Sequence, residues 1–339
     1  MSKILFVLKR REDYHAIVHS HVGLSTGLYN SAKFMHDMLL DSGFTSNIEV
    51  AADNNCIDRL VTKHKPTHVI IEALWVVPSK FTVLQKLHPN VKWIVRLHSE
   101  MPFMAGEGMA MDWIGDYVKC KNVYVACNAP RMLREVGLFL DKEKLIYLPN
   151  FYPQEYTKKK FNRNKDVVDV ACFGAIRPLK NHLVQAFAAV DFANQIGKKL
   201  RFHINAGRIE MNGNAVSHNL RGVFEHLYDE GHELVNHQWC PREDFLKICA
   251  QMDIGLQCNF SETFNIVSAD LLSQGVPIVS SKEIPWSSFL FNAEPADSKQ
   301  ICSRLKDAYD MPRLNVWLNQ FHLTNYTDKT RDIWHNYFS

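Results

Sequence analysis

Short apolar segments alternate with helical segments along almost the whole chain, and this alternation most constrains the fold. The first half predicts helices near 27–42, from 56 onward and at 80–88, and strands at 3–8, 46–51, 68–74, 92–98, 122–128 and 144–150. The second half predicts helices near 182–195, 217–230, 242–251 and 265–274, and strands at 168–176, 200–207, 234–239, 253–258 and 277–281. Strands that are apolar on both faces and alternate with helices form parallel sheets covered on both sides. The predicted fold class is therefore α/β, with two doubly wound Rossmann-like domains facing a cleft.

A polar, basic segment separates the two series. Residues 151–168 read FYPQEYTKKKFNRNKDVV and have no hydrophobic periodicity, which is typical of a linker. We therefore expect one domain at 1–150, a linker at 151–168, a second domain at 169–311 and an aromatic-rich C-terminal tail at 312–339.

Composition limits the classes of protein. The 339 residues are 46% hydrophobic and 22% charged with a formal net charge of +3, which is typical of a soluble globular protein and requires neither a nucleic-acid nor a membrane partner. The eight cysteines contain no C-x-x-C pair, so reduced thiols are expected rather than disulfides or zinc. The apolar run near the N-terminus is too short for a signal peptide, and no segment approaches the roughly 20 apolar residues of a spanning helix. We expect a cytoplasmic protein.

The segment 261–280, SETFNIVSADLLSQGVPIVS, carries the clearest chemistry. It predicts a polar turn, a helix over 265–274 that ends at Gly275, and a short buried strand. Free N–H groups and the helix dipole at such a helix start suit a phosphate. Glu262 in the turn and Asp270 inside the helix add two carboxylates, which bind vicinal hydroxyls well. The segment therefore suggests a nucleotide-sugar site, with an amphipathic helix bearing two solvated acids as the alternative.

This segment resembles the E-x7-E segment of retaining GT-B glycosyltransferases of family 4, and here it reads E-x7-D. The resemblance extends from the loop at Gly27 to Ser280, with four motifs in the family's order. It implies a GT-B fold in which 1–150 is the acceptor side, 169–311 binds the nucleotide sugar, and the 312–339 helix packs back on the first domain. Simple core packing explains the aromatic tail equally well. The resemblance implies no cofactor beyond the nucleoside diphosphate sugar, and no D-x-D segment suggests a metal.

The segment 172–182, CFGAIRPLKNH, resembles the family's phosphate-binding turn. Gly174 relieves the turn, and the cations of Arg177 and Lys180 would neutralise the leaving diphosphate. Lys180 matches the family's lysine directly, whereas the family's arginine position is Ala175 here. Surface charges capping a loop are the alternative. The further donor-binding candidates implied by the resemblance are Gly27, Asn205, Gly207, Arg208, Trp239, Cys240, Thr263, Phe264, Asn265 and Ile266, together with Asp270 for the ribose.

The first domain contributes His98, which follows the strand at 92–97 where the family carries a histidine beside the donor sugar. The resemblance therefore implies His98 and Glu262 as the catalytic residues. Gly27 corresponds to the second glycine of the family's first loop, with Ser25 or Thr26 at the first.

The acceptor side is less defined by the sequence. Glu100 or Asp112 could orient or deprotonate an acceptor hydroxyl, or be solvated. The same loops contain His15, His19 and His21. The basic residues that could track a polyanion are Lys9, Arg10, Arg11, Lys158, Lys159, Lys160, Arg163 and Lys165.

The resemblance implies retaining transfer of a sugar from a nucleoside diphosphate sugar, with UDP favoured, to an acceptor hydroxyl. The KRRED start and compact length resemble enzymes of tailed phages, which suggests a hydroxymethylated pyrimidine in DNA as acceptor. A lipid or polysaccharide acceptor and a non-catalytic nucleotide-sugar-binding module are the alternatives. A nicotinamide dehydrogenase is disfavoured, because no G-x-G-x-x-G follows the first strand. The sequence does not predict the sugar or the oligomeric state.

Overall fold

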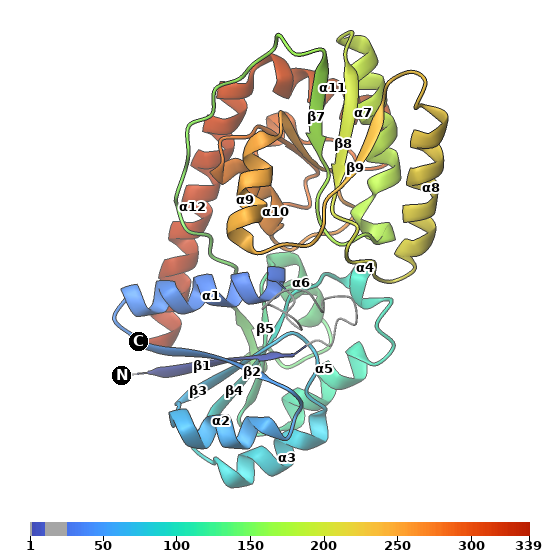
Figure 1. Cartoon of the computed structure of the whole chain (residues 1–339). Helices are drawn as coiled ribbons and strands as arrows, with labels where there is room; N and C mark the ends of the chain where they lie inside the picture. The colour runs from blue at the N-terminus through green and yellow to red at the C-terminus, as the bar shows by residue number, and fades with distance from the viewer. Residues whose placement is uncertain (1, 11–25) are drawn as a thin grey trace. The chain divides into compact units, whose positions relative to one another are not determined.

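The computed structural model describes residues 2–10 and 26–339 and divides into two compact units (Figure 1). The first unit contains Met1–Pro153 together with Tyr326–Ser339, and the second contains Gln154–Asn325. Each unit is built on its own parallel sheet.

The sheet of the first unit has six strands in the order β2-β1-β3-β4-β5-β6. Its strands are β1 (Lys3–Lys9), β2 (Thr45–Ala51), β3 (His68–Glu72), β4 (Lys92–Leu97), β5 (Val123–Cys127) and β6 (Leu145–Tyr147). The connecting helices are α1 (Thr26–Asp41), α2 (Cys56–His64), α3 (Pro78–Leu87), α4 (Met101–Met104), α5 (Ala110–Lys119), α6 (Pro130–Val136) and the 3-10 turn η1 (Lys142–Lys144).

Alternate residues of these strands pack against helices on opposite faces, as the period of two requires. Leu5 and Val7 belong to the core cluster that includes residues of α2, α3 and α5. The ring of Phe6 instead stacks on Trp334 of helix α12 (Pro312–Phe338), with ring centroids 6.0 Å apart. Figure 1 shows α2 and α3 on the side of this sheet opposite α1. Both faces are therefore covered, which is why the strands are apolar throughout.

The sheet of the second unit has five strands in the order β11-β10-β7-β8-β9. Its strands are β7 (Val167–Ala171), β8 (Lys199–Ile204), β9 (Glu233–Asn236), β10 (Ile254–Gln257) and β11 (Ile278–Ser280). Its helices are α7 (His182–Gln195), α8 (Gly213–His226), α9 (Arg242–Gln251), α10 (Ile266–Ser273), α11 (Ser298–Asp310), the first part of α12, and the 3-10 turns η2 (Pro178–Lys180) and η3 (Phe289–Phe291). The chain extends the sheet from β7 through β8 to β9, then returns to add β10 and β11 on the other side of β7.

The predicted α/β class is confirmed, and the predicted helices at 182–195 and 242–251 agree with α7 and α9 to the residue. Helices α4, α5, α6 and α11 were not predicted. Helices α4 and α6 contain only four and seven residues, which is too short for a periodic signal. Helix α11 buries Ile301, Leu305 and Ala308, and this 4-then-3 spacing is a helical signal that the sequence does contain.

The segment expected as a linker packs against the second unit. The backbone N–H and the hydroxyl of Thr157 donate to the carbonyl of Ser273 at 2.7 and 2.8 Å, which satisfies the C-terminal end of α10. Gly275 has φ +70°, and a Cβ there would lie 2.7 Å from the Thr157 carbonyl. Only glycine therefore fits between α10 and the segment.

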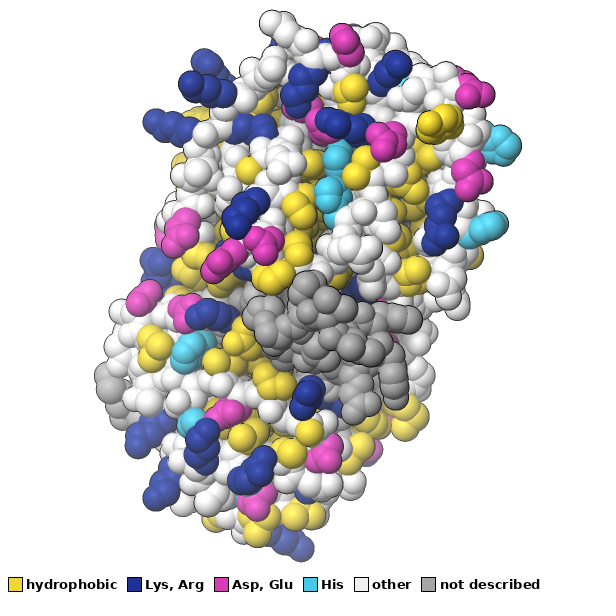
Figure 2. All heavy atoms as spheres, viewed as in Figure 1, with side chains coloured by type: hydrophobic (Ala, Val, Ile, Leu, Met, Phe, Trp, Pro, Cys, Tyr) yellow, Lys and Arg dark blue, Asp and Glu magenta, His cyan; other side chains and the backbone are white. Residues whose placement is uncertain are grey.

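Figure 2 shows Lys and Arg side chains along the edge of the second unit where this segment runs. Three of its five cations have partners in that unit. Lys159 donates to the carbonyl of Ala250, Arg163 donates to that of Asp310 at 2.9 Å, and Lys165 pairs with Asp253 at 3.1 Å. These cations fix the segment in place, whereas the other two, Lys158 and Lys160, are exposed and form no ion pair with the described residues.

A buried ion pair links two strands of the first unit. Glu72 and Arg96 are register partners on β3 and β4, both side chains are fully buried, and Arg96 Nη1 lies 3.2 Å from Glu72 Oε2. Arg96 also donates to the Leu148 carbonyl at 3.0 Å and to the Asn150 side chain. Its guanidinium lies 5.2 Å from the Trp334 ring centroid, which ties the last turns of α12 to the same sheet. None of the described helices is both long and apolar enough to cross a membrane.

We predict that Arg96→Met lowers the free energy of unfolding by about 3–5 kcal/mol at neutral pH, because it leaves the Glu72 carboxylate buried without its cation. Burial raises the pKa of Glu72, but the charges of Arg96 and His98 outweigh burial and hold that pKa below its usual range. The stability that the pair contributes is therefore present at neutral pH and lost as the pH falls below about 4. The deficit of the variant should shrink over the same range.

Urea unfolding at several pH values measures this, with Lys63→Met as control. Lys63 pairs with Glu49 in the same unit but is 62% exposed, so its loss should cost no more than about 1 kcal/mol. Equal losses in the two variants would contradict the assignment of Glu72 and Arg96 as a buried pair.

Candidate functional site

The residues predicted from the second half of the chain gather at the carboxyl ends of the strands in the second unit. The loop 172–182 follows β7 and the loop 258–265 follows β10. These two strands are neighbours in the sheet, and the strand order reverses between them. In doubly wound sheets, ligands bind at such a reversal, outside the carboxyl ends of the strands.

Glu262 is held by one of its two carboxylate oxygens. Its Oε1 accepts hydrogen bonds from the Lys180 ammonium, from Asn259 Nδ2 at 2.7 Å and from Asn265 Nδ2 at 3.1 Å. Every hydrogen bond that the described residues make with Glu262 is to this oxygen. The carboxylate is therefore fixed in orientation, while Oε2 is left to accept a bond from a ligand.

Asn265 joins this carboxylate to the start of helix α10. It has φ +61°, a left-handed conformation that asparagine tolerates better than most residues. Its Oδ1 accepts from the Ser268 N–H at 2.8 Å as the helix N-cap, and its Nδ2 bonds to Gln257 Oε1 at 2.9 Å as well as to Glu262. The first two N–H groups of α10, those of Ile266 and Val267, have no partner within the helix and are placed for an anion.

Lys180 supplies the buried cation of the site. It ends the 3-10 turn η2 and is 9% exposed. Burial lowers the pKa of its ammonium, although the Glu262 carboxylate opposes this effect. The neighbouring His182 is also buried; burial first, and then the charges of Lys180 and Arg177, lower its pKa to about 3, so it is neutral. The positive charge of this loop is therefore that of Lys180 and Arg177, and His182 adds none.

Gly174 and Asn205 shape the loop that carries Lys180. Gly174 has φ +122°, which side chains rarely adopt, and its N–H donates to Asn205 Oδ1 at 2.6 Å. Arg177 pairs with Glu210 at 3.3 Å, and Arg208 donates to the other oxygen of Glu210 at 2.6 Å. One carboxylate thus orients both of these predicted donor-binding arginines.

The remaining donor candidates of the second unit lie around this centre. A Cβ on Gly207 would lie 3.3 Å from the Trp239 backbone nitrogen, and the Arg208 guanidinium is 6.0 Å from the Trp239 ring centroid. Cys240 is partly buried, and burial raises the pKa of its thiol. Thr263 and Phe264 are buried, and Trp286 Nε1 donates to the Phe264 carbonyl at 2.7 Å.

Asp270, predicted as the ribose ligand, is 3% exposed and pairs with Arg242 Nη2 of α9 at 3.0 Å. This ion pair was not predicted, because the two residues are 28 positions apart. Gln257 and Asn259 were also missed, although a glutamine at the end of a buried strand and an asparagine two residues later are a usable signal for a site at the strand ends.

In the first unit, His98 follows β4 and its Nε2 bonds to the buried Glu72 carboxylate. Burial lowers the pKa of His98, the charge of Glu72 opposes this, and Arg96 reinforces it. Glu72 and Arg96 were not recognised as parts of a site, yet charged residues at the ends of apolar strands are the signal that could have found them.

The two acceptor-side candidates, Glu100 and Asp112, differ in burial. Glu100 is 3% exposed and pairs with Arg131 Nε at 3.0 Å, whereas Asp112 is exposed in the first turn of α5. Gly27 lies in the first turn of α1. The predicted residues Arg11, His15, His19, His21 and Ser25 lie outside the described residues. Among residues 2–10 and 26–339, no group of three His, Cys, Asp or Glu side chains is arranged to hold a metal ion.

We predict that Gly174→Ala costs about 1–3 kcal/mol of stability, because the left-handed backbone disfavours any side chain. Steric contact is not the cause, since the new Cβ would lie 4.0 Å from Lys180 Cε. Gly222→Ala in α8 is the control: a Cβ there meets nothing within 4 Å, and helix propensity should raise stability by up to about 1 kcal/mol. Thermal unfolding of both variants measures this, and a Gly174→Ala variant as stable as the parent would contradict the strained loop.

No protein-family model matches the chain, and no curated protein matches its sequence. Solved structures do resemble it over nearly its full length. Sucrose-phosphate synthase from Thermosynechococcus elongatus has a TM-score of 0.66 at 10% identity, covering 97% of this chain and 96% of that one. A UDP-forming trehalose-phosphate synthase from Burkholderia xenovorans has a TM-score of 0.67 at 11% identity, covering 100% and 98%. The HepE protein of Anabaena, solved with UDP and glucose, has a TM-score of 0.62 at 12% identity, covering 98% and 96%. The fold of this chain is therefore that of GT-B glycosyltransferases.

Proposed function

We propose that this protein is a retaining glycosyltransferase that transfers a sugar from a nucleoside diphosphate sugar, of the UDP type, to an acceptor hydroxyl. The observation that carries the proposal is the Lys180–Glu262 pair at the strand-order reversal of the second unit. It combines a buried cation, a carboxylate with one oxygen left for a ligand, and a helix start. Solved structures of similar fold that contain UDP or a UDP-sugar support the choice of donor.

Each residue then has a distinct role with the donor. Lys180, Arg177 and the first N–H groups of α10 bind the diphosphate, whose charge grows as the sugar departs. Oε2 of Glu262 accepts a hydrogen bond from a sugar hydroxyl. Asp270, oriented by Arg242, accepts from the ribose. His98, which Glu72 orients, is the residue to which the family resemblance assigns a contact with the sugar.

Retention of configuration follows if the acceptor hydroxyl attacks from the face that the diphosphate leaves. In that geometry the departing diphosphate is the base nearest to the acceptor proton. Lys180 and the helix start then stabilise the leaving group without a proton transfer from the protein.

The acceptor is the part of the proposal that rests on the sequence alone. A hydroxymethylated pyrimidine in DNA and a lipid or polysaccharide hydroxyl are both proposed. The basic segment at 151–168 is compatible with a DNA acceptor, but three of its five cations bind groups of the second unit. The segment therefore favours neither the DNA acceptor nor the lipid or polysaccharide acceptor.

We predict that UDP and one UDP-sugar raise the melting temperature, since a ligand bound only to the folded protein stabilises it. Glu262→Ala should weaken binding of the UDP-sugar about tenfold or more, through a lost charged hydrogen bond, and affect UDP less. Lys180→Met should weaken both ligands, because it removes the diphosphate cation. Calorimetric titration gives the affinities, with the exposed Glu225→Ala of α8 as control. Unchanged UDP-sugar binding in Glu262→Ala would refute the assigned contact.

We predict that the product keeps the anomeric configuration of the donor, which NMR of the isolated product measures.

Turnover should fall at least about 100-fold in Glu262→Ala, because the variant loses a charged hydrogen bond to the donor sugar. Duplex DNA containing 5-hydroxymethylpyrimidine and lipid or polysaccharide acceptors are assayed in parallel. An inverted product would exclude the retaining mechanism. Donor binding without transfer to any acceptor would instead favour the non-catalytic binding module.

A further inference from the structure

The first turns of helix α12 expose a row of apolar side chains. Met311, which precedes the helix, and Leu314, Trp317 and Phe321 are 44, 42, 62 and 53% exposed. Their spacing of three, three and four residues places them on one side of the helix, at 100° per residue. We call these four residues the apolar row.

The buried side of the same turns combines two asparagines with apolar residues: Leu323 is fully buried, and Leu318 packs against the core of the unit. Asn315 accepts from the Ile278 N–H at 2.9 Å and donates to the Ile278 carbonyl at 2.8 Å, so it pairs with the backbone of strand β11. Asn319 accepts from the Ser288 N–H at 2.8 Å. The helix is thus attached to its unit through asparagines as well as leucines, while its Trp and Phe face outward. None of the four residues of the apolar row belongs to the core cluster of the second unit or is among the hydrophobic residues packed against it.

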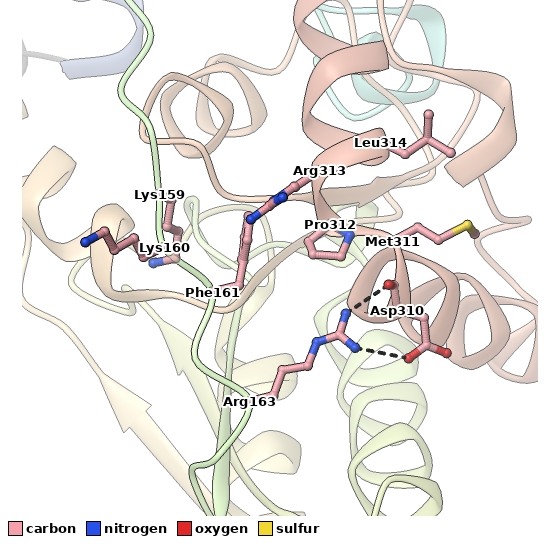
Figure 3. Close-up of a pocket in the computed structure, with 9 residues that line it drawn as sticks. All are labelled: Lys159, Lys160, Phe161, Arg163, Asp310, Met311, Pro312, Arg313 and Leu314. Carbon is pink, nitrogen blue, oxygen red and sulfur yellow. Dashed lines mark hydrogen bonds and ion pairs between the residues drawn. The ribbon is translucent and has the colours of Figure 1, made fainter.

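Cations lie beside the first residues of the apolar row. A hollow of about 770 Å³ between the 159–163 segment and the start of α12 is lined by Lys160 and Arg313 together with Met311 and Leu314 of the row (Figure 3). Arg163 in this hollow is engaged with the Asp310 carbonyl. Lys160 and Arg313 are exposed and form no ion pair with any residue that the structure describes. Cations and apolar side chains therefore share one surface.

The chemistry of this surface fits one kind of partner. A second copy docked on the same surface would oppose two cations to two cations. Single-stranded nucleic acid stacks its successive bases on several aromatic rings along a charged groove. The row has only two rings, those of Trp317 and Phe321, which stack on each other 6.3 Å apart with an interplanar angle of 22°, and Met311 and Leu314 have no ring. Trp, Phe, Leu and Met beside Lys and Arg are the side chains that enter the headgroup region of a membrane.

We propose that the apolar row, with Lys160 and Arg313, docks on an anionic lipid surface. The row enters the interface between headgroups and acyl chains, and the two cations contact lipid phosphates. This inference is independent of the acceptor, since a protein can work at a membrane on a soluble or a lipid substrate.

Flotation of the full chain with vesicles tests the proposal. The protein should float with vesicles of phosphatidylcholine mixed with phosphatidylglycerol, and much less with phosphatidylcholine alone. Added salt should weaken the binding, because the cations contribute through screened charges. Trp317→Ala/Phe321→Ala and Lys160→Glu/Arg313→Glu should each lower the partition about tenfold or more.

Two matched controls separate this surface from general charge and hydrophobicity. Lys121→Glu/Lys142→Glu makes the same charge change on exposed lysines of the first unit, and Phe289→Ala removes an aromatic ring that is 76% exposed. Both should bind like the parent. All changed side chains are exposed, and circular dichroism verifies that each variant is folded.

Absence of binding to anionic vesicles would overturn the proposal, whether or not the protein then proves to bind single-stranded DNA or to form a dimer in solution. Binding that survives both surface variants, or that falls equally in the controls, would overturn the assignment of this surface.

Discussion

The ion pair between Lys180 and Glu262 joins two loops, although the two residues are 82 positions apart in the sequence. Burial of an ammonium ion is costly unless a carboxylate compensates it, so the turn after β7 and the turn after β10 are stable only together. The carboxylate in turn needs donors, and Asn259 and Asn265 supply them. Asn265 also begins α10. The Lys180–Glu262 pair is therefore linked through Asn265 to the start of α10, and it orients the Glu262 carboxylate at the strand ends.

Such a site is organised before any ligand arrives. Donors and dipoles that are already oriented do not have to reorganise when charge develops in a reaction, which is the largest advantage that a protein has over water. The orientation is established during folding, in the left-handed backbone of Asn265 and Gly174 and in the desolvation of Lys180. Asn265, Gly174 and Lys180 thus carry a local cost in backbone conformation or desolvation, and the same three residues bring the polar groups of the site together.

The sequence predicted the helix and the loop residues of this site better than the ion pairs between them. The helix at 265–274, its start after a polar turn and its end at Gly275 follow from local rules, and the structure has α10 at Ile266–Ser273. Glu262 and Lys180 were identified through their positions in a motif. Their mutual contact, the pairing of Asp270 with Arg242 and the pairing of Glu72 with Arg96 were not predicted. Such pairs join elements distant in sequence, and a pattern within one segment carries no information on what faces it.

Helix α12 shows the same limit for hydrophobic residues. The aromatic tail was expected to pack on the first domain or simply to contribute to a core. Trp334 and Phe338 are buried, whereas Trp317 and Phe321 of the same helix are exposed. In the first turns, Asn315 pairs with the backbone of β11, Asn319 accepts from the Ser288 N–H, and Leu318 packs against the core. These polar and apolar contacts together turn the opposite side of the helix outward. The aromatic residues on that side are left for something other than the core of the protein.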